Sequence, residues 1–221
     1  MYFLNVVEQK GWYFLTTLMS GWPATVSVAL GALAFALVFG LVVALMRISV
    51  WKVLRWPSTA YVEFFRGTPA LVQLFVIYFG FPDWGYQPTP MQAAIIGLGL
   101  NGAAYLSEIY RAGIESIHRG QMEAALALGM TPARAMRYIV LPQAIRTMLP
   151  PMTNFAIVLL KDTSIVFAVG VLEVMALARQ LVTETLTSAP IYLMAGAMYL
   201  CVTIPMARLA ARLERQRQAW Q

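Results

Sequence analysis

The sequence predicts an all-α integral membrane protein with about five transmembrane helices in a single domain, residues 1–221. Its residues are 60% hydrophobic and only 12% charged, whereas a soluble domain has about 45–50% apolar and about 25% charged residues. Several apolar runs approach or exceed the ~20 residues that a helix needs to cross a bilayer. The charged residues lie in clusters between these runs, so the net charge of +6 indicates membrane topology rather than nucleic-acid binding.

The N-terminal part predicts a lead-in followed by a first span. Residues 1–21 are mixed, and we expect them to form an amphipathic helix along the membrane surface. Residues 23–46 carry no charge and are long enough to cross. Gly31 and Gly40 in this span, and Gly21 beside it, would let another helix approach closely, so we interpret them as packing positions.

A second helix is expected to start at Pro57, which suits a first helical turn, and to continue through the apolar stretch that ends at Phe81. Glu63 and Arg66 lie three residues apart in it and can pair on one face. Such charges can instead extend to water from the edge of a span, so these residues also have a purely structural explanation. Residues 81–90, rich in proline and glycine, predict a short loop.

The third span is expected at about residues 91–109, where Asn101 should hydrogen-bond across a helix interface. A fourth apolar helix, residues 149–160, is expected to break at residues 161–164. The last span covers residues 191–209.

Between the fourth helix and the last span, another helix should run from residue 165 to about residue 182. It carries Glu173, Arg179 and Glu184, which make it too polar for a clean span. We therefore expect this segment to be partly re-entrant or outside the membrane.

Residues 121–142 form the longest segment that cannot lie inside a bilayer. The segment begins with strong helix formers, and Gly129 suits the left-handed position that ends a helix. Thr131 then predicts an N-cap and Pro132 the first residue of a second short helix. That second helix should end near Pro142, because proline removes a hydrogen-bond donor.

The first of these two helices has an apolar face. Met122, Ala125 and Leu126 can share that face, with Glu123 to one side. A short helix of this kind can plug a groove on a partner protein. On spacing alone, an interfacial helix resting on lipid is an equally good interpretation.

The segment has a fixed order of anchor residues: Glu123, Ala124, Ala125, Gly129, Ile139, Leu141 and Pro142. This order resembles the EAA loop of the permease subunits of ABC importers. Residues 61–69 and 105–113 resemble the polar amino-acid branch of the same family, and the resemblance covers nearly the whole chain from Trp22 onward. It implies the type I ABC importer permease fold. It also implies that residues 121–142 supply coupling helices that dock into a cytoplasmic ATPase subunit through Glu123, Ala124, Ala125 and Gly129.

The break at residues 161–164 predicts a substrate site, because polar groups inside a membrane are costly and usually functional. Lys161 and Asp162 could neutralise each other, or they could bind the carboxylate and amino groups of an amino acid. A helix beginning at Ile165, capped by Thr163 or Ser164, would present free N–H groups to a carboxylate. A structural kink with a local ion pair is the alternative.

The resemblance extends to this site, because the matching stretch of amino-acid permeases lines the transport cavity. The predicted substrate-binding residues are Arg66, Thr68, Asn154, Lys161, Asp162, Thr163 and Ser164. Members that bind arginine or lysine can have an acid directly after the asparagine. That position is Phe155 here, which disfavours a strictly cationic substrate.

The expected partners follow from the same resemblance. No GxxxxGK[ST] phosphate loop occurs, so two separate ATP-binding cassette subunits would bind ATP and Mg. This chain would need no cofactor and would not itself be an enzyme. A second permease (another copy or a homologue), an extracytoplasmic amino-acid-binding protein and the lipid bilayer complete the expected partners. One cysteine and one histidine offer no Cys/His metal site.

Lysine and arginine placement predicts the topology in the bacterial cytoplasmic (inner) membrane. The positive-inside rule places three basic groups in the cytoplasm: Arg47, Lys52 and Arg55; Arg111, Arg119, Arg134, Arg137 and Arg146; and Arg208, Arg212, Arg215 and Arg217. The N-terminus would then lie outside and the C-terminus in the cytoplasm.

Two other classes of function fit the residues less well. A channel or secondary transporter would not need an EAA loop. An intramembrane enzyme would need a nucleophile with a positioned base, but the sole histidine, His118, lies in the polar loop and no GxSxG elbow is present.

Overall fold

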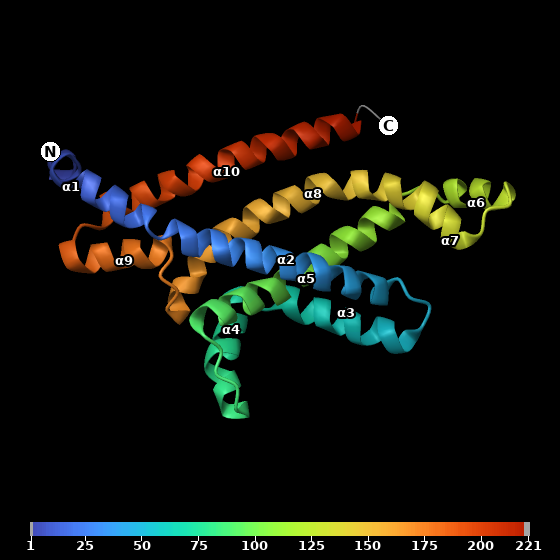
Figure 1. The fold of residues 1–221 in the computed structure, drawn as a ribbon, viewed down its shortest axis with the longest axis horizontal. Coiled ribbons are helices and arrows are strands. Elements are labelled where there is room, and N and C mark those ends of the chain that lie inside the picture. The colour runs from blue at the N-terminus through green and yellow to red at the C-terminus, as the bar shows by residue number, and fades with distance from the viewer. Residues whose placement is uncertain (1, 219–221) are drawn as a thin grey trace.

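The computed structural model describes residues 2–218, and that range contains helices and no strand. Four long helices run roughly side by side along one axis (Figure 1). They are α2 (Trp22–Arg47), α5 (Pro90–Glu115), α8 (Leu141–Asp162) and α10 (Ser188–Gln218). The contact between α2 and α5 is the most extensive one in the described chain, so these two helices form the centre of the bundle.

The first expected span is confirmed as α2, and close glycine packing explains its fit against α5. A Cβ atom added to Gly40 would lie 3.0 Å from the carbonyl oxygen of Ala103, and one added to Gly31 would lie 2.9 Å from the side chain of Ile95. Glycine is therefore required for this close approach of two helices.

Helix α1 (Tyr2–Met19) leads almost directly into α2, and residues 8–47 are long and apolar enough to count as one span. Phe14 and Leu18 are fully buried and pack with residues of α9 (Val174–Thr185) and α10. Helix α1 therefore forms part of the helical body, and its expected place along the membrane surface stays a prediction.

The second expected helix is wrong in both its start and its continuity. Helix α3 (Lys52–Gly67) begins before Pro57, which lies inside it, and the extended residue Trp51 is its N-cap. Thr68 and Pro69 are both extended, and the next segment, residues 70–84, turns away by 107°. A residue before proline is pushed out of the helical region, so the Thr68–Pro69 pair breaks the helix.

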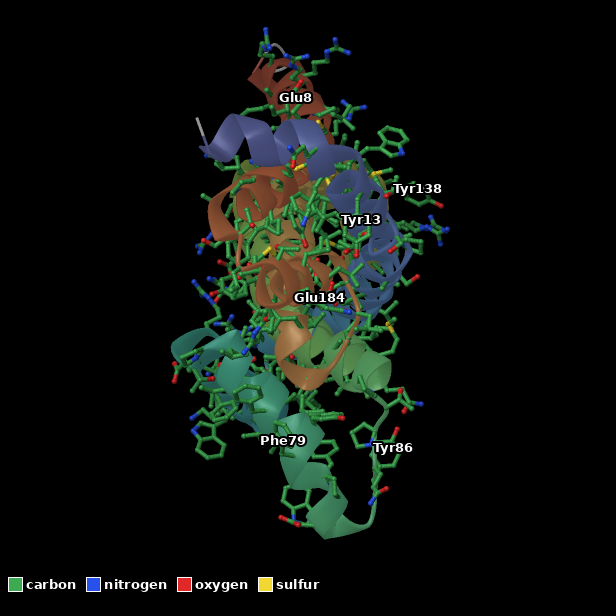
Figure 2. All side chains as sticks on the ribbon, turned by 90° about the vertical axis from the view of Figure 1, so that its left-hand side faces the viewer. Glu8, Tyr13, Phe79, Tyr86, Tyr138 and Glu184 are labelled. Atoms are coloured by element: carbon green, nitrogen blue, oxygen red, sulfur yellow. The ribbon has the colours of Figure 1, made fainter. Side chains whose placement is uncertain are left out.

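The segment after this bend projects from the body. It consists of α4 (Ala70–Phe75), the π-helical turn η1 (Val76–Gly80) and the 3₁₀ helix η2 (Phe81–Trp84), and it ends at the left-handed Gly85. Figure 2 shows Phe79 on this projection and Tyr86 on the chain that returns from it.

The polar segment forms α6 (Arg119–Ala127) and α7 (Pro132–Ala135) at one end of the molecule (Figure 1). Gly129 has the expected left-handed backbone, with φ of +80°. Thr131 is the N-cap of α7 and accepts a hydrogen bond from the backbone N–H of Arg134, and Pro132 is the first helical residue. These local predictions are confirmed.

The predicted end of the second short helix is wrong. Helix α7 continues through the π-helical turn η3 (Met136–Val140) into α8, although Pro142 is the second residue of α8. In η3 the N–H of Leu141 bonds to the carbonyl of Met136, five residues back. Proline lacks a donor and collides with the carbonyl four residues before it. The wider π turn accommodates Pro142 without ending the helix.

The predicted helix start at Ile165 is also wrong. After α8 the chain tightens into the 3₁₀ helix η4 (Thr163–Val169), reaches the left-handed Gly170, and only then forms α9. The hydroxyl of Thr163 donates to the carbonyl oxygen of Leu160 at 2.7 Å, so it does not cap a new helix.

Within residues 2–218, three helical stretches are long and apolar enough to cross a membrane, and a fourth is added if the bent pair of residues 52–67 and 70–84 is one span. Helix α5 has 26 residues, about 39 Å at 1.5 Å per residue, so it also has the length to cross. Polar residues such as Asn101 and Glu108 lower its hydropathy.

Candidate functional site

The face of α6 that points away from the molecule matches only part of the face expected, of which Leu126 is 41% exposed. Ala125 is only 4% exposed and packs inside the chain, and Met122 is partly covered. Glu123 and Ala124 are exposed, and Leu128, directly after α6, is 83% exposed. We call Glu123, Ala124, Ala127 and Leu128 the α6 outer face. It combines one acid with exposed apolar side chains, a composition that suits docking into a groove.

The bend between α3 and α4 is held by a polar joint. The Gln73 side-chain amide donates to the carbonyl of Phe65 at 2.9 Å and to the Thr68 hydroxyl at 2.7 Å. Asn101 on α5 also donates to the Phe65 carbonyl, at 3.0 Å, and to the Gln73 side chain at 3.0 Å. These donors satisfy carbonyl groups that the end of α3 leaves free. The predicted cross-helix bond of Asn101 is confirmed.

Arg66 does not pair with Glu63, which lies exposed on α3. Instead it lies 3.4 Å from Glu108 on α5. Glu108 also accepts from Arg47 at the end of α2 and lies 2.8 Å from Arg111. One carboxylate therefore joins three helices, and this pairing could not be inferred from spacing because the partners lie far apart in sequence.

Aromatic contacts connect Arg66 to α8. The guanidinium lies 5.4 Å from the centre of the Tyr105 ring, and Tyr105 stacks on Phe155 with ring centres 6.2 Å apart. Phe155 is partly buried between α5 and α8 and approaches Gly102 so closely that a Cβ there would lie 2.9 Å from its ring. An acid in place of Phe155 would therefore point toward α5 and Tyr105.

Asn154, Val158 and Lys161 share one exposed face of α8, as the sequence predicts. Asp162 is half-buried, and Lys161 forms no ion pair with it in the described part of the chain. The two side chains therefore do not meet in a direct salt bridge, and their mutual neutralisation stays a prediction. The α8 face stays open in the isolated chain, with an amide and an ammonium group available to a ligand or a neighbouring chain.

A pocket of about 350 Å³ adjoins this face. Its lining residues come from the end of α8, η4, α9 and α10, and we call it the Lys161 pocket: Lys161, Ser164, Met175, Tyr192, Gly196 and Tyr199. Lys161 is its only charged residue. Two of the predicted substrate residues, Lys161 and Ser164, thus lie together at one pocket. Arg66 and Thr68 lie at the α3–α4 bend, and Thr163 is fully buried.

Sequence reasoning did not assign Glu173 a site role. Its side chain is fully buried, caps the N-terminus of α9 and accepts a hydrogen bond from Tyr199 of the Lys161 pocket at 3.0 Å. An acid inside an otherwise apolar stretch is the signal that could have identified it. No group of three potential metal ligands occurs among residues 2–218.

Three comparisons relate the chain to known proteins. Residues 36–218 match the family described as the binding-protein-dependent transport system inner membrane component. The chain is 42% identical over 220 residues, 96% of each sequence, to the probable amino-acid permease protein YxeN of Bacillus subtilis (strain 168). It is 40% identical over 198 residues to the probable glutamine ABC transporter permease protein GlnM of the same organism, which covers 90% of this chain and 92% of that one.

A solved structure is also similar. The crystal structure of an amino acid ABC transporter with histidines contains a chain that superposes with a TM-score of 0.88 at 36% identity. The match covers 97% of this chain and 98% of the other.

Proposed function

We propose, since this chain belongs to the family of binding-protein-dependent transport system inner membrane components, that it carries a polar amino acid across the bacterial inner membrane. The chain is an amino-acid ABC transporter permease subunit, as its relatives and its fold show. The finer parts of the proposal concern its contact with the ATPase, its substrate and its orientation.

Coupling to the ATPase would occur through the α6 outer face. The observation that carries this proposal is that the α6 outer face lies exposed at one end of the molecule. The left-handed Gly129 and the Thr131 cap turn the chain sharply between α6 and α7. This turn leaves Glu123 and Leu128 exposed at the end of the molecule. Ala125 would support the face from inside, because it is buried.

The importer would contain two ATP-binding cassette subunits that hydrolyse ATP, a second permease and an extracytoplasmic amino-acid-binding protein. The family description supports a binding protein. The names of the relatives support separate subunits, because each is called a permease protein. The open face of α8, with Asn154 and Lys161, would meet the substrate or the second permease.

The substrate would be a zwitterionic amino acid with a side chain that is not strictly cationic. Lys161 offers an ammonium group for the carboxylate, and Asp162 offers a carboxylate for the amino group. One relative is a probable glutamine permease and another a probable amino-acid permease, and the similar structure is that of an amino acid transporter with histidines.

The orientation would place α6 in the cytoplasm. Arg47 at the end of α2, Lys52 at the start of α3 and the basic end of α10 lie toward the same end of the molecule as α6 (Figure 1). Gathering of basic residues at one end supports a cytoplasmic location for that end.

Reconstitution of the chain with its ATPase and binding-protein partners tests the proposal. We expect ATP-dependent uptake of a neutral polar amino acid, and ATP hydrolysis stimulated by the loaded binding protein. Uptake without ATP would instead indicate a channel or secondary transporter. In a Cys201→Ala background, a cysteine at Asp83 should react only from outside and one at Arg134 only from the cytoplasm.

A further inference from the structure

Glu173 is an acid that is completely buried, yet its hydrogen bonds are all satisfied by the protein. One carboxylate oxygen, Oε1, accepts from the backbone N–H of Ala176 at 2.7 Å. The other, Oε2, accepts from the N–H of Met175 at 2.8 Å and from the Tyr199 hydroxyl at 3.0 Å. A simple helix cap needs only the first two bonds, so the bond to Tyr199 requires a separate explanation.

The surroundings of Glu173 join four parts of the chain. The hydroxyls of Thr25 on α2 and Thr163 on η4 lie beside the Tyr199 phenol, and both threonines are fully buried. The backbone N–H of Val174 donates to Thr25 at 3.4 Å. We call Thr25, Thr163, Glu173 and Tyr199 the buried polar cluster. Because buried polar groups are costly when unpaired, this cluster has few alternative arrangements.

The cluster lies directly behind the Lys161 pocket. Tyr199 belongs to both, because it lines the pocket and its hydroxyl bonds to Glu173. Thr163 separates Asp162 from Ser164, and Met175, whose N–H bonds to Glu173, also lines the pocket. Thus one buried carboxylate contacts two of the residues that shape the pocket wall.

We propose that Glu173 is a positioning residue that fixes the wall of the Lys161 pocket by holding Tyr199. The proposal rests on the proposed function in one respect, namely that the pocket admits the transported amino acid. Glu173 itself touches no substrate; it orients the residue that does.

The length and chemistry of glutamate are both required by this geometry. Aspartate could still cap α9, since it is a favoured N-cap residue, but its side chain is one methylene shorter and would not reach Tyr199. Glutamine has a single acceptor oxygen, so its amide NH₂ would face a backbone N–H or the phenol. Glu173→Asp therefore separates the cap from the positioning contact, and Tyr199→Phe removes the same contact from the other side.

The test uses a cysteine in the pocket of the assembled importer. In a Cys201→Ala background, Gly196→Cys places a thiol on the pocket wall, where an added Cβ meets no atom within 4 Å. The rate of its reaction with a small maleimide reports the shape of the pocket, and protection by glutamine or histidine reports substrate. We expect Glu173→Asp and Tyr199→Phe each to change the labelling rate by about fivefold, the effect of about one hydrogen bond. The double variant should change it no further.

Matched controls make the same chemical changes elsewhere. Glu184→Asp lies on the same helix α9, and Tyr13→Phe lies on α1; Figure 2 labels both residues. Both controls should label at the rate of the parent protein. Thermal melting should show Glu173→Asp and Tyr199→Phe folded.

The outcomes separate the two proposals. If Glu173→Asp and Tyr199→Phe are folded and label at the same rate as the parent protein, Glu173 only caps α9 and the positioning role is overturned. The positioning role would also be overturned if the double variant changed the labelling rate by the product of the two single effects, because the two residues would then act independently. If no amino acid protects the cysteine in the parent protein, the pocket is not the substrate site. Altered rates in the two variants would then still support the contact between Glu173 and Tyr199.

Discussion

The two ends of the molecule differ in how a side chain can affect transport. At the α6 outer face, Glu123 and Leu128 are exposed and could act by touching another protein. Around the Lys161 pocket, Glu173 and Thr163 are fully buried and act only through neighbouring residues. Coupling should therefore be separable from folding at the first end, whereas pocket shape and stability should change together at the second.

Among the variants that test this difference between the two ends, Gly129→Pro is expected to have the largest effect on transport. Gly129 has φ of +80° and its N–H bonds to Leu126 at 2.9 Å. Proline fixes φ near −65° and has no N–H, at a cost of about 3 kcal/mol or more. We expect stimulated ATP hydrolysis to fall about a hundredfold, while membrane insertion is retained. Gly80→Ala, at an ordinary backbone conformation, is the control. Stimulation at the wild-type level would show that the turn is not needed for coupling.

Replacement of both charges at the pocket should have the next largest effect. Lys161 and Asp162 make no ion pair with each other among the described residues. If they bind the substrate, Lys161→Leu/Asp162→Leu leaves its charged groups without partners, at about 1–3 kcal/mol or more, and affinity falls roughly tenfold or more. The concentration dependence of amino-acid uptake by proteoliposomes measures this change in affinity. Uptake within about twofold of wild type would leave only a structural role.

Glu123→Lys should give a smaller effect that is confined to coupling. Glu123 is exposed, so its reversal should leave the melting temperature unchanged. At the contact it should weaken docking by about 1 kcal/mol, or about fivefold in the concentration of ATPase needed for assembly. Glu214→Lys is the matched charge reversal on α10. A lower melting temperature for Glu123→Lys alone would contradict the separation of coupling from folding.

The smallest effect is expected in the ion cluster on α5, between the two ends. Arg66 is 45% exposed and Glu108 keeps Arg47 and Arg111 when Arg66 is removed. Arg66→Ala should therefore cost less than about 1 kcal/mol. Arg47→Ala should cost more, because the Arg47 side chain is only 14% exposed. Melting of the purified chain in detergent compares the two, and equal shifts would contradict this ranking.

Local rules predicted the turns of the molecule well. Gly129, Thr131 and Pro132 each have the conformation expected, because their preferences depend only on neighbouring backbone. The first and last spans were also predicted, since length and apolar composition suffice for them.

The errors arose where distant contacts or backbone adjustments decided the outcome. Pro142 was expected to end a helix, but the π turn before it accommodates the ring. Arg66 was matched with nearby Glu63, whereas Glu108 is brought to it by the packing of α5 on α3. Glu173 could not be assigned a role, because its partner Tyr199 lies on another helix.

Cross-linking from Leu128 most directly tests the central claim that α6 docks on the ATPase. Leu128 is 83% exposed, and Leu186, at the other end of α9 from Glu173, is 89% exposed. A photoreactive group at either position would be activated in the fully assembled importer. We predict an adduct between this chain and the ATPase from Leu128 and none from Leu186. No ATPase adduct from Leu128, or equal adducts from both positions, would contradict the account.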